Sequence, residues 1–256
     1  MSRLGGQLSY ARSLLITAPL VGIYTAVMGS ISVASSLVDS TGRIQHACAR
    51  IWSRMILWTS GVHLTVRGLD NIQPGVPCVF CVNHQSHMDI PIVLVAIPGQ
   101  FRFLSKKELF GIPFLGWHMR RSGYVPIDRG NPRAAVKSIR AAAAQVQKGM
   151  PVVIFPEGGT SIEGAILPFK GGGFLLATQS NVDVVPVTIR GSRQVLVPNT
   201  YHVRSGKVEV IVGAPISSRG LTPDELAART HEIILETFHQ PGLLDSGSER
   251  RTGGLR

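Results

Sequence analysis

The 256-residue sequence is poor in cysteine and in aromatic residues, and each shortage argues against a class of protein. Three cysteines, without a second Cys-x-x-Cys pair, argue against a disulfide framework and are typical of a reducing compartment. An aromatic content of 6%, with no recognisable binding module, argues against a nucleic-acid-binding protein. The glycine-rich stretches match neither a Walker A loop nor a dinucleotide-binding fingerprint.

Acidic residues are also scarce: 15 Asp and Glu stand against 26 Lys and Arg, a formal net charge of +11. This excess calls for a polyanionic neighbour, such as nucleic acid, an anionic membrane or a phosphorylated substrate. It is local, because residues 102–148 contain ten basic and two acidic residues, whereas residues 149–256 contain ten of each. Residues 132–148 predict a helix with Arg133, Lys137 and Arg140 opposite its apolar side. That basic face is either solvated or in contact with an anionic surface.

Charge is absent from residues 14–38, a run of 25 residues. At about 1.5 Å per residue this run can cross a hydrocarbon core of about 30 Å, although Pro19 and several Gly, Ser and Thr weaken it. Arginines on both sides leave its orientation open. Residues 44–59 then show an amphipathic helical pattern, with Ile44, Ala47, Ile51, Met55 and Trp58 on the apolar side. We expect residues 1–60 to form a helical hairpin attached to an anionic membrane surface, with the following domain facing the cytoplasm.

Two other interpretations of the N-terminal region stay open. A secretory signal peptide cleaved near Ala34 would have the same basic start and apolar middle. A helix buried in the core of a soluble domain would also be apolar. Soluble domains rarely begin with such a long uncharged run, so membrane attachment is the interpretation that we carry forward.

After the N-terminal region, strand-like runs alternate with helical patterns. Strands are predicted at residues 63–67, 77–82, 101–105, 124–127, 151–155, 184–189 and 207–212, and helices at 90–97, 132–148, 172–179 and 223–238. The alternation predicts an α/β fold, with a single mixed-sheet domain flanked by helices over residues 61–241. Residues 242–256 are predicted to be a disordered tail.

The polar stretch Asn-His-Gln-Ser-His-Met-Asp at residues 83–89 separates a predicted strand from a predicted helix. α/β proteins usually place their chemistry at such turns. The spacing of His84 and Asp89 allows the carboxylate to fold back onto one imidazole nitrogen and fix the tautomer, as a general base for a hydroxyl requires. Alternatively, Asp89 caps the helix and His84 is an ordinary turn residue.

A metal site is another interpretation of the same region. Cys78, Cys81, His84 and His87 recur every third residue, but such steps along a strand alternate between its faces. The cysteines are therefore expected in the core, and no metal is expected. A metal-dependent hydrolase that uses His84, His87 and Asp89 remains the enzymatic alternative.

Three further loops follow predicted strands. Arg129 lies between a strand and a helix, Glu157 lies in a glycine-rich turn, and Lys170 precedes a helix whose free amides favour anions. Each alone has a structural explanation: a surface ion pair, a capping carboxylate and turn-forming glycines.

In combination the loops are specific. NHQSHMD, GYVPIDR, FPEGGTS and VPVTI occur in this order after an apolar segment, accompanied by KKELFGIPFLG and PFKGGGF. The sequence from about residue 66 to residue 216 thereby resembles the glycerolipid acyltransferase family, typified by 1-acylglycerol-3-phosphate acyltransferase. In that family the third block usually reads FPEGTRS, whereas here Gly159 and Thr160 stand in place of its Thr and Arg.

The resemblance implies that His84 is the catalytic base and Asp89 the carboxylate that orients it. The residues that it implies for substrate binding are Arg129, Glu157, Gly158, Lys106, Lys107 and Lys170, with Gly123 and Pro186 matching the second and fourth blocks. Because Thr160 replaces an expected arginine near the acceptor head group, the other cations would have to compensate.

The implied reaction moves an acyl chain from acyl-CoA or acyl carrier protein to the free hydroxyl of lysophosphatidate, giving phosphatidate. No cofactor or metal is implied. Another lysolipid or glycerol 3-phosphate as acceptor is the alternative within the class. A non-catalytic anionic-lipid-binding protein is the alternative outside it, since it needs the apolar segment and the basic block but not a His/Asp pair.

Overall fold

The computed structural model describes residues 3–128, 130–161 and 163–241. Arg129 and the predicted disordered tail at 242–256 therefore lie outside the described residues. Seven strands form one sheet in the order β1-β7-β6-β2-β5-β3-β4. The strands are β1 (Val62–Arg67), β2 (Val79–Val82), β3 (Arg102–Lys106), β4 (Val125–Ile127), β5 (Val152–Ile154), β6 (Val184–Arg190) and β7 (Gly206–Val212).

The sheet is mixed, as the sequence predicted. β6, β2, β5, β3 and β4 run parallel to one another, β7 is antiparallel to β6, and β1 is parallel to β7. Cys81 of β2 lies opposite Ile154 of β5 and Pro186 of β6. The carboxyl ends of the five parallel strands therefore meet at one edge of the sheet, where α/β folds place ligands.

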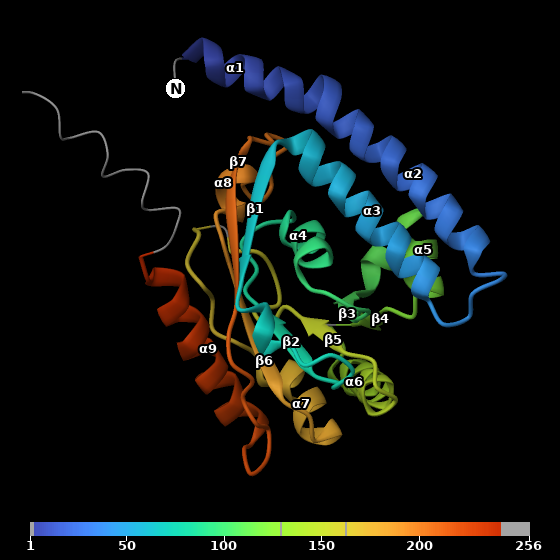
Figure 1. Ribbon diagram of the computed structural model, residues 1–256, viewed down its shortest axis with the longest axis vertical. Helices are drawn as coiled ribbons and strands as arrows, with labels where there is room; N and C mark the ends of the chain where they lie inside the picture. Colours follow the sequence, from blue (N-terminus) through green and yellow to red (C-terminus); the bar gives the residue numbers. More distant parts are fainter. Residues whose placement is uncertain (1–2, 129, 162, 242–256) are drawn as a thin grey trace, which may run out of the picture.

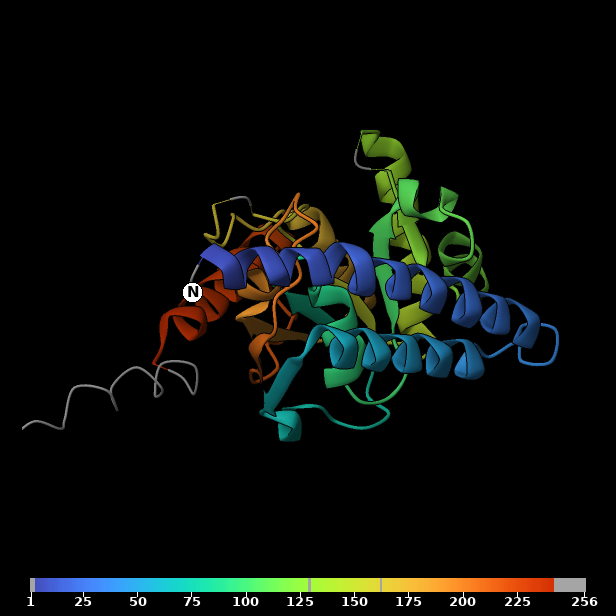
Figure 2. The ribbon, with the colours of Figure 1, turned by 90° about the horizontal axis from the view of Figure 1, so that it is seen from above.

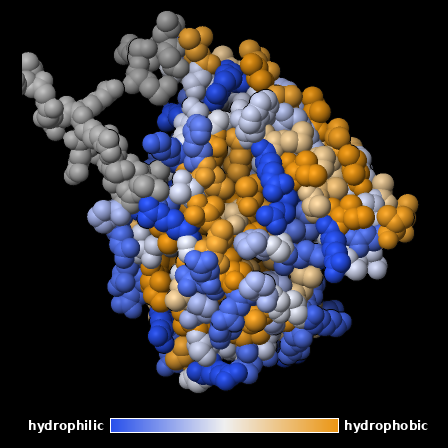
Figure 3. All heavy atoms as spheres, viewed as in Figure 1, coloured by the Kyte–Doolittle hydropathy of each residue, from blue (hydrophilic) through white to orange (hydrophobic). Residues whose placement is uncertain are grey.

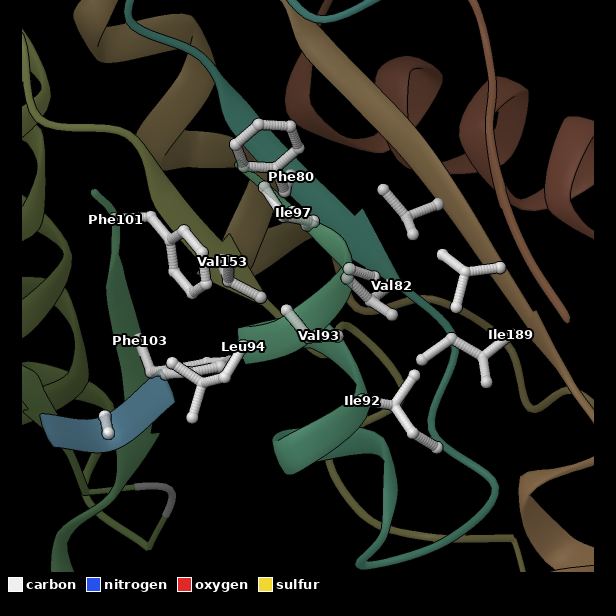
Figure 4. Packing of buried hydrophobic residues seen from close by; sticks show 14 of the residues in the cluster. Phe80, Val82, Ile92, Val93, Leu94, Ile97, Phe101, Phe103, Val153 and Ile189 are labelled. Carbon is white, nitrogen blue, oxygen red and sulfur yellow. The ribbon is translucent and has the colours of Figure 1, made fainter. Parts of the chain in front are cut away.

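Helices cover both faces of the sheet, so β2 is buried on both sides. Phe80 and Val82 belong to one hydrophobic cluster, and Val79 and Cys81 belong to the other. Figure 4 shows part of the first cluster, in which Phe80 lies near Ile97 and Phe101, with the Phe80 and Phe101 ring centroids 6.5 Å apart. This cluster packs under α3 (Arg43–Ser60), α4 (Asp89–Ala96) and α5 (Leu115–Arg121); the other packs under α6 (Pro132–Gln147), α7 (Gly171–Ser180) and α9 (Pro223–His239). A short helix, α8 (Ser192–Val195), follows β6.

The N-terminal segment is one long helix made of α1 (Arg3–Arg12), a π-helical turn at Ser13–Thr17 and α2 (Ala18–Ser35). It pairs with α3 as a hairpin and runs across the domain (Figures 1 and 2). Pro19 does not break it, because this residue lies in the first turn of α2, directly after the π-helical turn. The helix ends at Ser35, three residues before the end of the uncharged run.

The polarity of this long helix is the reverse of that of a soluble surface helix. Its buried residues are small, and mostly polar: Ser13, Thr17, Gly29 and Ser32. Its outward residues are large and apolar, including Leu15 (77% exposed), Ile16, Ile23, Val27 and Ile31. Apolar side chains accordingly gather along the upper right margin of the molecule, over α1 and α2 (Figure 3).

Hydrogen bonds attach the long helix to α3 and to the domain along its length. Ser13 Oγ donates to the carbonyl of Val203 at 2.9 Å, and Trp52 Nε1 of α3 donates to Thr25 Oγ1 at 3.0 Å. Ser32 Oγ lies 2.6 Å from Nδ1 of His118 on α5. Within the described chain, residues 6–35 form one helix that is long and apolar enough to cross a bilayer.

Candidate active site

The loop between β2 and α4 is fixed first to the neighbouring strand. Asn83 is fully buried, and its side chain makes two hydrogen bonds to the backbone of Ile189 on β6. Nδ2 donates to the Ile189 carbonyl at 3.0 Å, and Oδ1 accepts from the Ile189 amide at 2.7 Å. This pairing sets where the chain leaves the sheet, and His84 follows immediately.

His84 and Asp89 are in contact, as their spacing predicted. Oδ2 of the fully buried Asp89 accepts from Nδ1 of His84 at 2.9 Å and from the amides of Gln85 and Ser86 at 2.7 and 2.8 Å. The carboxylate does not cap α4, because it points back into the turn. An imidazole whose Nδ1–H donates to a carboxylate keeps Nε2 as a proton acceptor.

The His84 ring is held by stacking on its face as well as by the hydrogen bond to Asp89 at its edge. It stacks on Phe155, with ring centroids 4.2 Å apart and an interplanar angle of 26°. Only 13% of the His84 side chain is exposed, and the residue lines a cavity. The ring therefore has a fixed tautomer and a fixed plane, with one edge available to a ligand in that cavity.

Glu157 holds the backbone of the same loop. One carboxylate oxygen accepts from the His84 amide at 2.5 Å, and the other accepts from the Leu167 amide at 2.8 Å. The side chain is buried, and this burial raises its pKa to about 7, against the lowering effect of the two amides. Glu157 thus joins the loop after β5 to the loop after β2, and its two oxygens are used by the protein itself.

A cavity of about 480 Å³ extends from His84 into the space between the hairpin and the domain. This volume is within the range of small-molecule sites, about 300–1,000 Å³. At the sheet edge the cavity is lined by His84, His87, Lys106, Gly158, Gly159 and Thr160. Deeper in, its walls are mainly apolar and come from four helices and one strand, among them Met28 and Gly29 of α2, Ala49 and Trp52 of α3, Ile90 and Leu94 of α4, Phe103 of β3, and Leu115 and Met119 of α5.

Three lysines that the sequence assigned to substrate binding lie at or near this edge. Lys106 is exposed and lines the cavity. Lys107 Nζ lies 2.5 Å from Oδ2 of Asp128. Lys170 lies against Gly158, so closely that a Cβ at Gly158 would be 2.8 Å from Nζ; the φ of +79° at this position also requires glycine. The structure therefore brings Lys106 and Lys170 to the cavity loops, while Lys107 is engaged with Asp128.

The cysteines do not join the histidines in a metal site. Cys78 and Cys81 are buried, and burial raises the pKa of the Cys78 thiol to about 12. In the part of the chain that the structure describes, no group of three or more His, Cys, Asp or Glu side chains is arranged to hold a metal ion. His87 lines the cavity beside His84, with ring centroids 6.5 Å apart, and burial lowers its pKa.

Two parts of the site were not predicted from the sequence. Asn83 was seen only as a turn residue, and its pairing with Ile189, 106 positions away, has no local signal. The cavity was missed altogether, because its walls come from residues between Thr25 and Thr160. Glu157 was assigned to substrate binding, whereas the structure places it on the backbone of the His84 loop.

The fold and this loop define an α/β protein that places a histidine–carboxylate pair at the carboxyl ends of its parallel strands, beside an apolar cavity. The family model described as Acyltransferase matches residues 63–190, half of the chain. The chain belongs to the Acyltransferase family.

Named relatives agree with this assignment. The chain is 34% identical over 199 residues to a chloroplastic 1-acyl-sn-glycerol-3-phosphate acyltransferase of Brassica napus, covering 77% of the chain but only 57% of the relative. It is 30% identical over 249 residues to the 1-acyl-sn-glycerol-3-phosphate acyltransferase of Saccharomyces cerevisiae, covering 94% of the chain and 81% of the relative. The crystal structure of the 1-acyl-sn-glycerophosphate (LPA) acyltransferase PlsC from Thermotoga maritima has the same fold, with a TM-score of 0.77 at 24% identity over 93% of this chain and 96% of that one.

Proposed function

We propose that this protein is an O-acyltransferase that moves an acyl chain from a thioester donor to the free hydroxyl of lysophosphatidate, giving phosphatidate. The observation that carries the proposal is the histidine–carboxylate pair at 2.9 Å, whose imidazole lines an apolar cavity. Relatives that span most of the chain are named for acylation of 1-acyl-sn-glycerol 3-phosphate. Acyl-CoA or an acyl carrier protein would supply the acyl group.

His84 acts as the general base in this proposal. Nε2 takes the proton of the acceptor hydroxyl as its oxygen forms a bond to the thioester carbon. The tetrahedral intermediate then collapses, the C–S bond breaks, and the thiolate takes the proton back from Nε2. Asp89 keeps the imidazole in the required tautomer and stabilises the imidazolium between the two steps. The reaction balances without a covalent enzyme intermediate and without a cofactor.

The negative oxygen of the intermediate needs donors that are in place before the reaction begins. Gly159 and Thr160 line the cavity beside His84, and we assign their backbone amides to this role. The apolar depth of the cavity accommodates the acyl chain of the donor or the acceptor. Positioning of the two reactants against Nε2 then supplies the remainder of the catalysis.

The acceptor phosphate is assigned to the cations at the sheet edge. Lys106 lines the cavity and Lys170 lies against Gly158, so both can contact a phosphate there. Lys107 directly follows Lys106 in the chain, so we include it in the same group of cations. Thr160 lies at the cavity where the family pattern has an arginine, which leaves Arg129 as the matched guanidinium of the second block. Arg129 itself remains a sequence-based assignment, since it lies outside the described residues.

Arg129→Ala is expected to raise the KM for lysophosphatidate by at least about tenfold, because a charge-assisted pair with phosphate contributes about 1.5–3 kcal/mol. Arg129→Lys should restore part of the loss, since an ammonium cannot reproduce the guanidinium fork. Steady-state kinetics with lysophosphatidate and with a phosphate-free lysolipid distinguish this role. An unchanged KM for lysophosphatidate, together with fast transfer to the phosphate-free acceptor, would contradict a phosphate-bearing acceptor.

We further propose that the hairpin lies in one leaflet of an anionic membrane rather than crossing it. The long helix is hydrogen-bonded to the domain at Ser13 and Ser32 and to α3 at Thr25, and large apolar residues cover its outward face. The apolar side predicted for residues 44–59 is also outward, with Trp58 82% exposed. Such a helix buries its apolar face at the headgroup boundary. Three free cysteines suit a domain that faces the cytoplasm.

Replacing Leu15, Ile23 and Ile31 together by serine is expected to shift the protein from the membrane pellet to the supernatant, because all three are exposed, apolar and outside the two core clusters. The measurement is sedimentation with vesicles that contain anionic phospholipid. Circular dichroism should show an unchanged helix content. A variant that still sediments fully, or wild-type protein that stays soluble without detergent, would rule out this membrane contact.

The proposed reaction is tested by offering the purified protein acyl-CoA and acyl carrier protein donors with a panel of acceptors. Lysophosphatidate, glycerol 3-phosphate and phosphate-free lysolipids cover the alternatives, and mass spectrometry identifies the product. Phosphatidate as the main product supports the proposal. A protein that binds anionic lipid but forms no acylated product would be the non-catalytic alternative.

A further inference from the structure

The outward face of α6 is a basic surface with an apolar centre, formed by Arg133, Val136, Lys137 and Arg140. The three cations are exposed, and Val136 between them is 38% exposed. Together they enclose a shallow hollow of about 390 Å³. Protein interfaces commonly combine an apolar centre with a charged, solvent-accessible rim.

No acidic residue occurs between Pro132 and Gln147, so α6 has no internal ion pair that would neutralise these cations. They follow one another at intervals of four and three residues, and therefore lie on one side of the helix. A row of side chains that all carry positive charge attracts and orients an acidic partner.

The basic row begins at the same edge of the sheet as the cavity. Lys106, which lines the cavity, pairs in register with Ile127 of β4. The next residues along each strand, Lys107 and Asp128, form an ion pair, and Asn131 then caps α6 through its side chain. The first turn of α6 is thus connected to the rim of the site by a short run of fixed contacts, and Arg133 lies in that turn.

A membrane is a poor match for this face. α6 packs on the face of the sheet with α7 and α9, whereas the hairpin with the outward apolar residues is on the opposite side, with α3, α4 and α5. Figure 1 shows α6 and the long N-terminal helix on opposite sides of the sheet. A bilayer that contacts the apolar face of the hairpin would leave the basic face of α6 in water, where a soluble protein can approach it.

We propose that the basic face of α6 is the docking surface for an acyl carrier protein, a small acidic protein that carries the acyl group as a thioester on a flexible arm. Docking there places the partner beside the rim, and the arm then passes over the edge of the sheet to His84. The inference rests on the proposed acyl transfer and adds which donor the protein recognises and where. Acyl-CoA has no protein surface and does not need this contact.

The test compares two triple variants with the wild-type protein. One combines Arg133→Ala, Lys137→Ala and Arg140→Ala. The control combines Lys207→Ala, Arg219→Ala and Arg229→Ala, which removes the same charge from exposed residues elsewhere. Each protein is assayed with lysophosphatidate and two donors, palmitoyl-CoA and a palmitoylated acyl carrier protein. Binding of the acyl carrier protein is also measured directly by titration calorimetry, and membrane binding by vesicle sedimentation.

The α6 variant is expected to lose at least about tenfold in kcat/KM with the acyl carrier protein and less than about twofold with palmitoyl-CoA. The loss should be largest at low ionic strength, where electrostatic steering is strongest. The control should keep both activities, and the calorimetric affinity should fall only in the α6 variant.

Three results would overturn the docking surface: equal losses with both donors, an equal loss in the control, or a wild-type protein that neither binds nor uses the acyl carrier protein. Loss of vesicle binding in the α6 variant with donor kinetics unchanged would show that this face contacts membrane instead. If the wild-type protein transfers from neither donor, the proposed function fails. In that case the docking surface is tested without catalysis, by comparing the calorimetric affinities of the α6 variant and the control variant for the acyl carrier protein.

Discussion

His84→Ala should lower kcat for acyl transfer by on the order of 10²–10⁴, the usual contribution of a positioned general base. The acceptor hydroxyl has a pKa far above neutrality, so it needs a base within hydrogen-bonding distance when it attacks the thioester. The His84 side chain contacts Asp89 and Phe155 but makes no bond that joins two strands, so the fold should survive its removal. Product formation under saturating substrates measures the loss.

Asp89→Asn separates the charge of Asp89 from its structural role. All three hydrogen bonds go to Oδ2, and Oδ1 has no partner among the described residues. An asparagine with its carbonyl oxygen in the Oδ2 position can therefore accept the same three bonds and hold the turn, at a cost of about 1–3 kcal/mol for the NH2 group that it buries in the Oδ1 position. It lacks the negative charge that stabilises the imidazolium, so kcat should fall by on the order of 10²–10⁴ while the fold is retained.

Both variants need a matched control and a folding measurement. His63→Ala removes an exposed histidine from the edge strand β1 and should leave kcat unchanged. Circular dichroism and the midpoint of thermal unfolding report whether each variant is folded. Wild-type kcat in a well-folded His84→Ala or Asp89→Asn protein would mean that the pair is not the base and its orienting partner.

The elements that the sequence predicted correctly are those whose burial leaves a local pattern. All seven strands were found: β2, β5 and β6 are buried, largely apolar runs, and β1 alternates between apolar and polar residues. α6 and α9 lie where the sequence predicted helices, and the structure adds a capping box formed by Thr222 and Glu225 at the start of α9. The loops that follow β2, β4 and β5 were grouped through the family resemblance, and the parallel pairing of the strands brings them to one edge of the sheet.

The missed elements depend on contacts between distant residues. α5 has only seven residues, no side-chain cap, and a glycine at its second position, so nothing local signals it. It is held instead by packing on α2, where Ser32 bonds to the buried His118, 86 positions away. The cavity has the same origin, because it is the space that α2, α3, α4, α5 and β3 leave between them. Periodicity in one segment gives no information about such a space.

The N-terminal helix shows a related limit. Its lack of charge and its length could be read directly, but the sequence pattern did not indicate which side faces the domain. The structure buries Ser13, Thr17 and Ser32 and exposes the larger apolar residues. The hydroxyls of Ser13 and Ser32 have their partners at Val203 and His118, which lie far along the chain.

Glu157→Gln is expected to lower kcat by at least about tenfold with little change in KM, because the substitution disturbs the backbone that positions His84. The carboxylate of Glu157 accepts from two buried amides, those of His84 and Leu167. A glutamine has one acceptor oxygen, so its NH2 group must face one of these amides. A buried donor left without an acceptor costs about 1–3 kcal/mol, and the loop that carries His84 can relieve it only by moving. A KM effect without a kcat effect would instead indicate direct contact of Glu157 with substrate.

The same variant has a pH signature in stability. Burial raises the pKa of Glu157 in the folded protein from 4.5 to about 7. The folded state therefore holds this proton more tightly than the unfolded state, and the free energy of unfolding falls as pH rises from about 4.5 to about 7, by on the order of 3 kcal/mol. Glutamine does not titrate, so the contribution of this position should be independent of pH. Urea unfolding at intervals between pH 5 and pH 8 measures the difference between the two proteins. Parallel curves would show that Glu157 is already ionised throughout this range, and the loop would then be held by a permanently charged carboxylate.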